Sequence, residues 1–433
     1  SNKMSAPKTT LNAESSSRAP RNAFEGMGRP SKPGWTSGRL DRLTEWAGSK
    51  EANRPIICEY EPQGLWLWTK WRGTVLKMTF GSVLFCMGMG IALDFFARKY
   101  LSSTKAVTWS LLAVPPASEP FIQSLNGLKK LWEYQLSLAT FIVTFFLSHA
   151  YSYWQKVYNT TRGIQGRIND FCMLLSIGAQ RGSSGDDSGT EGYSNEAKDL
   201  VMRCTRLIRL SHTFFWAATP TASNGLNDCE EFIRDAANCP LPVDDDHIGP
   251  LLLSPYGLRA LVRVGQLTKD EAKNLAQSDL PPSQYAFILL VWAGLHCMDG
   301  LKKGILRGGN GFEENLLRQL TTLRASMFDI DDFRAGRMPL AYVQLVQVLV
   351  DSLVLYAPFA LYAELGSLSI PVVGLITLFF RGLLTLSKSF LDPFGVEGFA
   401  EQNIRVDVLV SELNFGAARR WLRAGLVLPG ASN

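Results

Sequence analysis

Residues 132–153, WEYQLSLATFIVTFFLSHAYSY, form a hydrophobic stretch long enough to cross a lipid bilayer, which takes about 20 residues. The stretch also carries polar side chains at Glu133, Ser137, Thr140, Thr144, Ser148 and His149. Polar side chains at membrane depth normally face the interior of a helix bundle or a water-filled path. The sequence therefore predicts a membrane helix that lines an aqueous pathway, not one surrounded by lipid.

Three further stretches, residues 75–97, 340–363 and 371–390, are also apolar enough to span a bilayer. The link between the last two is short, which predicts that these helices are antiparallel neighbours. Asp351 and Arg381 lie inside them. We interpret the two residues as an ion pair that holds the helices together, and the alternative is a role in an ion path.

The segments between the membrane stretches are charged and amphipathic, and no region is rich in strands, so the predicted fold class is an all-α membrane protein with a helical aqueous domain. The predicted parts are a flexible N-terminal arm (1–60), membrane helices one and two (61–155), the aqueous domain (156–330), membrane helices three and four (331–395) and a C-terminal tail (396–433). Within the aqueous domain we expect helices at 157–178, 196–217, 255–278, 283–300 and 312–327. The apolar helix at 283–300 could instead be a further span.

Composition and charge exclude several classes of function. The net charge is only +5, and no Lys/Arg stripe is interleaved with aromatic residues, so a nucleic-acid partner is not indicated. The N-terminal arm is rich in Ser, Pro, Gly, Ala and Arg, which is typical of an organellar targeting segment or of an ordinary flexible terminus.

No enzyme class, metal site or cofactor is indicated by the motifs. The four histidines are scattered, and none of the seven cysteines forms a C-x-x-C pair, although Cys229 and Cys239 could pair with each other. The glycine-rich stretch 308–311 lacks the Lys-Ser/Thr of a phosphate loop and a preceding strand, so we interpret it as a turn between helices.

Leu138, Ile142 and Phe146 recur every fourth residue in the second membrane stretch, which places them on one side of a helix. Such residues can simply pack or face lipid. They can also form a hydrophobic constriction that gates a pore by dewetting. The spacing alone leaves both interpretations open.

Several segments resemble, in the same order, those of the bestrophin family of anion channels. They are Trp71-Arg72-Gly73, the run Leu261-Val262 with Gly265, Thr268 and Glu271, Thr322-Leu323-Arg324 followed by Pro339-Leu340, the pair Phe379 and Gly382, Asp392-Pro393-Phe394-Gly395, and Glu401-Gln402-Asn403. The resemblance covers about residues 70–430.

This resemblance implies a homopentamer, in which each subunit has four membrane helices and a cytosolic or stromal helical part. The second membrane helix would line a pore for chloride or bicarbonate, with Ser137, Thr140 and Thr144 as pore-lining hydroxyls. The pore neck would consist of Leu138, Ile142 and Phe146. A shifted register would place the neck at Ser137 and Phe141 instead.

The resemblance also implies a second aperture, on the aqueous side, near Gly311 and Phe312. The calcium clasp of animal bestrophins is reduced here to Glu397 within residues 396–400, and calcium needs six to eight oxygen ligands, so we expect no strong calcium activation. This reduction fits the plant and algal relatives of thylakoid membranes, and the alternative location is the plasma membrane. The alternative function is a non-conducting structural membrane protein with the same fold.

Overall fold

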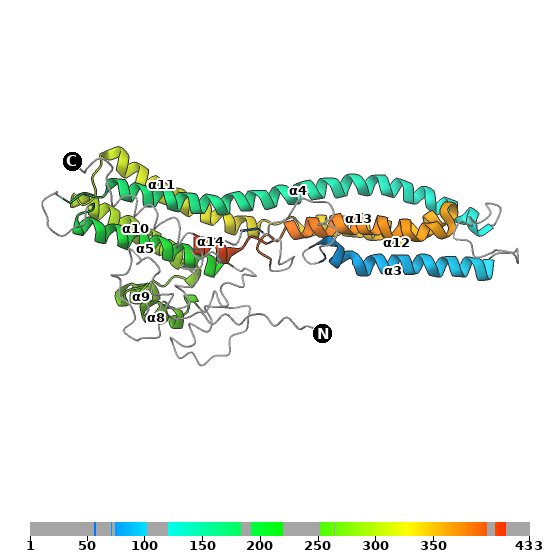
Figure 1. Ribbon diagram of the computed structural model, residues 1–433, viewed down its shortest axis with the longest axis horizontal. Helices are drawn as coiled ribbons and strands as arrows, with labels where there is room; N and C mark the ends of the chain where they lie inside the picture. Colours follow the sequence, from blue (N-terminus) through cyan, green and yellow to red (C-terminus); the bar gives the residue numbers. More distant parts are fainter. Residues whose placement is uncertain are drawn as a thin grey trace, which may run out of the picture. The chain divides into compact units, whose positions relative to one another are not determined.

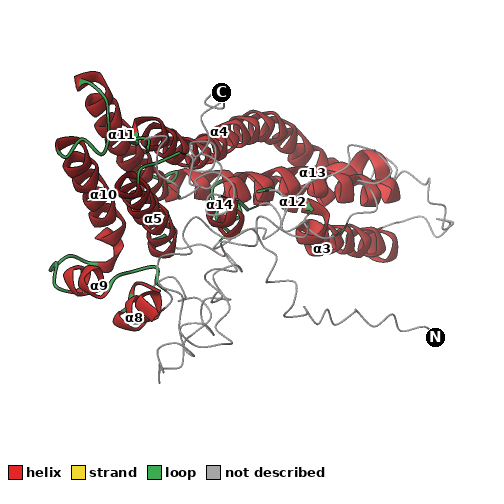
Figure 2. Cartoon of the chain, turned by 60° about the vertical axis from the view of Figure 1, so that its left-hand side comes forward, coloured by secondary structure: helices red, strands yellow, loops and turns green. Residues whose placement is uncertain are grey.

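The computed structural model describes residues 56–57, 71, 74–101, 120–182, 192–219, 252–263, 265–395 and 403–412. Among these residues the regular elements are all helices (Figures 1 and 2), and the only β-type pairings are two isolated bridges. The predictions for the N-terminal arm, for Cys229 and Cys239 and for Glu397 lie outside the described residues.

The helices are α3 (Val75–Phe96), η4 (Ala97–Leu101), α4 (Pro120–Gly178), α5 (Asn195–Ala218), α8 (Pro255–Arg263), α9 (Lys269–Ala276), η6 (Pro282–Gln284), α10 (Tyr285–Lys302), α11 (Asn310–Ala335), α12 (Leu340–Leu365), η7 (Gly366–Leu368), α13 (Ser369–Phe390) and α14 (Val406–Glu412). The four predicted membrane helices are present as α3, α12, α13 and the first part of α4. All are labelled or traceable in Figure 1.

The predicted break after the second membrane stretch was wrong. That stretch and the amphipathic helix after it are a single helix of 59 residues, α4, because no Pro or turn residue interrupts the chain between them. The helices expected at 255–278 are α8 and α9. They are divided at Gly265, which has a φ of 73°, a left-handed conformation that glycine adopts without steric penalty.

The chain divides into two compact units. The first, which we call the span unit, comprises residues 57–160 and 332–404. The second, which we call the aqueous unit, comprises residues 1–56, 161–331 and 405–433. The borders fall inside α4 and α11, whereas α14 belongs to the aqueous unit, where the Gln165 side chain donates a hydrogen bond to its Leu409 carbonyl at 3.0 Å.

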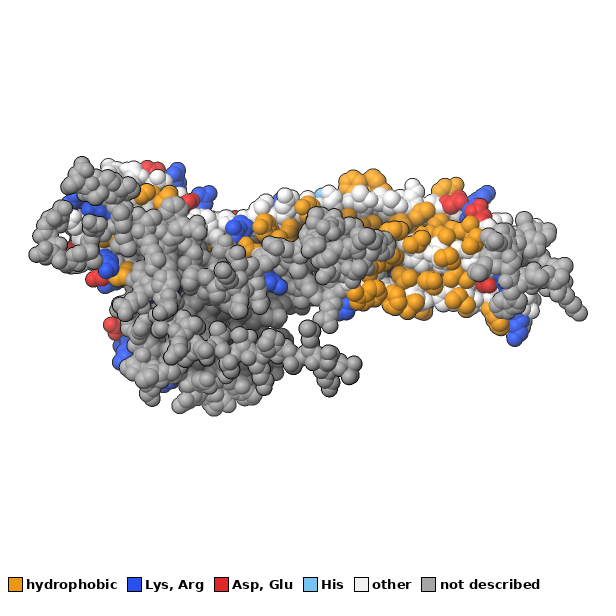
Figure 3. All heavy atoms as spheres, in the orientation of Figure 1, with side chains coloured by type: hydrophobic (Ala, Val, Ile, Leu, Met, Phe, Trp, Pro, Cys, Tyr) orange, Lys and Arg blue, Asp and Glu red, His pale blue; other side chains and the backbone are white. Residues whose placement is uncertain are grey.

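The span unit presents apolar side chains on its outside. Three stretches, Val75–Lys99, Gln123–Gly178 and Leu340–Phe390, are long and apolar enough to cross a membrane, and the third contains both α12 and α13. Figure 3 shows the hydrophobic side chains gathered over these helices. Exposure of large apolar side chains such as Phe85 and Phe379 to water is unfavourable, so a lipid environment explains this surface.

Close helix packing inside the span unit depends on glycine. A Cβ at Gly374 would lie 2.9 Å from the Met87 sulfur, and one at Gly382 would lie 2.8 Å from Val75 Cγ1. Small residues let two membrane helices approach so that their backbones are in van der Waals contact. These two glycines therefore fix α13 against α3.

In the aqueous unit α5 is the central helix. Nearly all of its residues from Cys204 to Ala217 are buried, and α10 lies along it. The apolar helix predicted at 283–300 is α10, and it is a packed helix of this unit, not one of the candidate spans. Its hydrophobicity therefore serves protein packing.

Candidate functional site

The membrane part of α4 has one packed face and one free face in the single chain. The packed face consists of the buried residues Trp132, Ala139, Val143, Phe146 and Ala150. The free face consists of the exposed residues Tyr134, Ser137, Leu138, Thr140, Phe141, Thr144, Phe145 and Ser148. The packed face is held to α12 by the Trp132 indole, which donates a hydrogen bond to the Leu353 carbonyl at 2.9 Å.

The residues predicted for the pore neck do not share the free face. Leu138 is exposed, Ile142 is partly buried, and Phe146 is completely buried with its ring 5.8 Å from that of Tyr342. Each step of four residues turns an α-helix about 40° beyond a full turn, so three such positions drift from one face toward the next. Ser137 and Phe141, the residues of the shifted register, are both on the free face.

The three predicted pore-lining hydroxyls, Ser137, Thr140 and Thr144, are all exposed. The Thr140 hydroxyl donates to the Leu136 carbonyl at 2.8 Å, and the Thr144 hydroxyl donates to the Thr140 carbonyl at 2.7 Å. Both threonine hydroxyls thus donate to the backbone of their own helix, and each must rotate about its Cβ–Oγ bond before it can donate to an anion. Side chains with a formal charge at neutral pH are absent from α4 between Glu133 and Lys156.

The predicted aqueous aperture is a packed turn. Gly311 is exposed at the start of α11, whereas the Phe312 ring covers the backbone of Gly178 and Gly308. A Cβ at Gly308 would lie 2.5 Å from Phe312 Cβ, so the turn needs glycine there. Gly308 and Gly309 lie between α10 and α11, as predicted, whereas Asn310 and Gly311 already belong to α11, and Phe312 is anchored within its own unit.

The predicted ion pair between α12 and α13 is present. Arg381 Nη2 lies 2.9 Å from Asp351 Oδ1, and the Gln347 amide donates to both Asp351 carboxylate oxygens at 2.7 and 2.6 Å. The Lys388 ammonium in turn donates to the side-chain amide oxygen of Gln347 at 2.6 Å. We call these four residues the charge ladder. It confirms the interpretation that the pair ties the two helices together.

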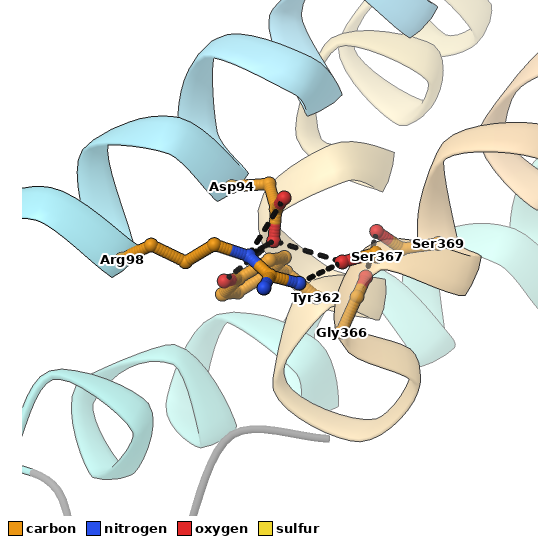
Figure 4. Close-up of polar contacts among 6 residues, drawn as sticks. All are labelled: Asp94, Arg98, Tyr362, Gly366, Ser367 and Ser369. Atoms are coloured by element: carbon orange, nitrogen blue, oxygen red, sulfur yellow. Dashed lines mark hydrogen bonds and ion pairs between the residues drawn. The ribbon is translucent and has the colours of Figure 1, made fainter. Parts of the chain in front are cut away.

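A second polar cluster in the span unit was not predicted (Figure 4). The Asp94 carboxylate accepts hydrogen bonds from Arg98 Nε at 3.0 Å, the Tyr362 hydroxyl at 3.1 Å and the Ser367 hydroxyl at 3.0 Å. Arg98 Nη2 also donates to Ser367 Oγ at 2.5 Å. The cluster fastens the end of α3 to the turn between α12 and α13. Only the four-residue spacing of Asp94 and Arg98 was visible in the sequence.

The segment Asp392-Pro393-Phe394-Gly395 forms a tight turn after α13. Gly395 has a φ of 79°, and the Asn403 amide lies against the position that a Cβ would occupy. The Ile404 N–H donates to the Pro393 carbonyl at 2.8 Å, and Arg337 lies 3.4 Å from the buried Asp392 carboxylate. The positive φ and the contact with the Asn403 amide explain why glycine occurs at position 395.

A buried ion pair organises the aqueous unit around the segment 261–271. Arg206 contacts both oxygens of Glu271 at 2.6 and 2.8 Å, and the Glu271 side chain also accepts from the Thr268 N–H in a capping box. Burial acts to raise the pKa of Glu271, but the hydrogen bonds from Arg206 and Thr268 outweigh it and hold that pKa below its ordinary value. Glu271 is therefore ionised at neutral pH.

His212 on α5 is a neutral, fully buried imidazole. Its Nε2 accepts a hydrogen bond from the Trp216 indole at 2.9 Å, which places the ring hydrogen on Nδ1. Burial lowers the pKa of His212 to about 3. Among the described residues, groups of three or more His, Cys, Asp or Glu that could hold a metal ion are absent.

Comparison with known proteins connects these features. The family model described as "Bacterial/Fungal Bestrophin protein" matches residues 215–414. That range contains the segment around Glu271, the charge ladder and the turn at Gly395. No curated protein sequence matches the chain.

Solved structures extend the likeness to most of the chain. A variant of a bacterial bestrophin homolog from Klebsiella pneumoniae, with one tryptophan changed to alanine, superposes with a TM-score of 0.50 at 16% identity, over 82% of this chain and 99% of that one. The same homolog solved with zinc phasing gives 0.50 at 14%, over 80% and 98%. The bestrophin family model therefore matches residues 215–414, and the solved structures show that the chain has the bestrophin fold, in agreement with the segments quoted from the sequence.

Proposed function

We propose that the protein is an anion channel, in which a ring of identical subunits conducts chloride or bicarbonate along a pore lined by α4. Five subunits are expected from the resemblance to bestrophins. The observation that carries the proposal is the free face of α4, which combines hydroxyls with the absence of formal charge at membrane depth. Such a face is costly to leave in lipid, and several copies around an axis give it water.

The chemistry of this face suits weakly held anions. Hydroxyl groups and backbone dipoles can replace part of the hydration shell of an anion without binding it tightly, and conduction requires sites that release the ion readily. A ring of lysines would hold anions more strongly, and α4 has none on this face. Chloride and bicarbonate lose water more easily than small cations do, so an uncharged, narrow passage favours them.

We place the narrowest part of the pore at Phe141, in the shifted register, instead of at Phe146. Phe141 is 62% exposed in the single chain, and its ring lies 4.6 Å from that of Phe145, one turn further on. Leu138, on the same face, remains a candidate for the neck. Phe146 already fills the core of its own subunit and has no surface left to present to an axis.

The alternative proposal is a structural membrane protein with the same fold and no conduction. The two exposed phenylalanines favour it, because a ring of such side chains can close an axial opening completely. For the membrane in which the protein works, we propose the thylakoid or, alternatively, the plasma membrane. The matched family model is described as bacterial and fungal, and the matched structures come from a bacterial homolog.

Reconstitution of the purified protein into planar bilayers tests the proposal. With a chloride gradient and a common cation, the channel proposal predicts a reversal potential close to that of chloride. Cation-selective current contradicts the proposal of an anion pathway. If intact wild-type rings carry no current but Phe141→Ala rings do, the phenylalanine side chains close the pore. If neither protein carries current, the structural alternative is supported.

A further inference from the structure

We propose that the charge ladder lies in the contact between subunits, where a second copy of this chain covers it in the membrane. The inference rests on the proposed ring and adds which face of the subunit meets its neighbour. The ladder consists of Gln347 and Asp351 on α12 and Arg381 and Lys388 on α13.

The ion pair of the charge ladder lies at the depth of the membrane centre. Asp351 is the twelfth of the 26 residues of α12, and Arg381 is the thirteenth of the 22 residues of α13, so the ion pair lies near the middle of both spans. A charged side chain at the centre of a bilayer costs about 2.5–3.5 kcal/mol even on an insertion scale. Pairing lowers this cost only where both groups are removed from lipid.

The side chains of the ion pair are partly exposed in the single chain. Arg381 Nη2 pairs with Asp351, yet Asp351 keeps 40% and Arg381 keeps 32% of its side-chain surface uncovered in the single chain. Both charges would therefore contact lipid tails in an isolated subunit. Some further polar or protein surface must cover them in the membrane.

The exposed face of α12 beside the ladder differs from an exposed apolar face of α13. Leu375, Phe379 and Leu383 are exposed and purely apolar, as expected for a face that contacts lipid. On α12, by contrast, the exposed Leu345 and Val348 alternate with the exposed Gln344 and the partly exposed Asp351. A mixture of packed aliphatic groups and a few paired polar groups is typical of helix contacts between proteins in membranes.

Water is a less suitable occupant than a second copy. The bulky aliphatic groups beside the ladder make a poor lining for water, and α4 already offers an uncharged hydroxyl face for the pathway. In a ring every subunit repeats the same contact, so one ladder per subunit would be covered by the next subunit in turn.

Site-specific photocrosslinking of the full chain in native-like membranes tests the inference. A benzophenone amino acid is placed at Val348, beside the ladder, and in a matched variant at Phe379, since the two side chains are 58% and 62% exposed. We expect Val348 to give a crosslinked dimer and higher bands, and Phe379 to give none. A lysine-reactive crosslinker applied to the wild type reports independently whether a ring exists.

The outcomes separate the two proposals. If the lysine-reactive reagent shows a ring and Val348 gives only monomers or lipid adducts, the contact surface is wrong while the ring stands. If only monomers are found with both reagents, the ring itself is wrong. Labelling of Val348→Cys by a water-soluble thiol reagent in intact rings would assign the ladder to an aqueous path and overturn the inference.

Charge substitution gives a second readout. Asp351→Asn and Arg381→Gln should each shift the ring toward monomers by at least about tenfold in detergent, because each leaves one uncompensated charge in the contact. The exchanged double variant Asp351→Arg with Arg381→Asp should recover part of that loss. Circular dichroism confirms that helix content is kept, and an unchanged ring in all folded variants contradicts the inference.

Discussion

The span unit and the aqueous unit both bury apolar cores, but they place their charged side chains differently. In the span unit the outside is apolar, as at Phe85 and Phe379, and the paired charges of the ladder are partly uncovered. In the aqueous unit the buried Arg206 is paired with the partly buried Glu271, and the buried His212 accepts a hydrogen bond from Trp216. The difference teaches that hydrophobicity alone does not identify a span here. Both α3 and α10 are apolar, but α3 leaves many of its large apolar side chains exposed, whereas the only exposed ones in α10 are Val291 and Leu295.

The largest contrast is expected between two phenylalanines of α4. Phe146→Ala removes a fully buried ring from the span unit and should destabilise the fold by about 3–5 kcal/mol. Phe141→Ala removes an exposed ring and should leave stability nearly unchanged while it raises single-channel conductance. Thermal unfolding in detergent and bilayer recordings measure the two effects. Equal loss of stability in both variants would contradict the assignment of the two faces.

The ion pair of the aqueous unit should be the next most sensitive site. Arg206→Met leaves the Glu271 carboxylate buried without its main partner, and we expect a loss of about 3 kcal/mol in unfolding free energy. Lys303→Met breaks the pair with Asp299, which is largely exposed, and should change nothing measurable. Hydrogen exchange of α5 reports the difference. Similar protection in both variants would show that burial does not determine how much an ion pair contributes to stability.

Glycine positions offer a smaller contrast. Gly395→Ala places a Cβ in a left-handed conformation, which costs about 1–2 kcal/mol, and pushes it against the Asn403 amide. Gly163→Ala, in a helical position with open space, should instead stabilise α4 by about 0.5–1 kcal/mol. Melting temperatures of the two variants should therefore move in opposite directions, and a shift of the same sign would refute the turn geometry.

Acidification should affect the aqueous unit through His212. Its folded pKa of about 3 lies below the value near 6.5 of the unfolded chain, so only the unfolded state takes up the proton between these values. Stability is fully present above pH 6.5 and falls by at most about 1.4 kcal/mol for each pH unit below it. The lowered pKa of Glu271 adds a loss at still lower pH. His212→Phe should flatten the slope between pH 6.5 and 5, and an unchanged slope would contradict the burial of a neutral imidazole.

The sequence predicted α3, α12 and α13, because each can be recognised from its length and apolarity alone. It did not predict the unbroken α4, because the polar residues after Tyr153 resemble a new amphipathic helix when read alone. The orientation of Phe146 was also beyond reach, since its partner Tyr342 is distant in the chain. The same applies to Asp94, whose partners Tyr362 and Ser367 lie 268 and 273 residues further along.

The ion pair of Asp351 and Arg381 was predictable for a physical reason. Opposite charges in adjacent membrane helices have few partners other than each other. The sequence could narrow the proposed pore neck only to a helix face, because a drift of about 40° per four residues makes the facing residue depend on the exact packing of α4.

The most direct test of the free face of α4 is its accessibility to water in a working channel. Thr144→Cys and, as a control, Leu84→Cys on the exposed face of α3 are exposed to a charged, water-soluble thiol reagent during bilayer recording. The parent protein, whose described cysteines Cys86, Cys172, Cys204 and Cys297 are all buried, sets the baseline. We predict that the reagent blocks the anion current of Thr144→Cys and leaves that of Leu84→Cys unchanged. A current that persists in the Thr144→Cys channel, with the thiol unmodified, would show that α4 does not face the pore.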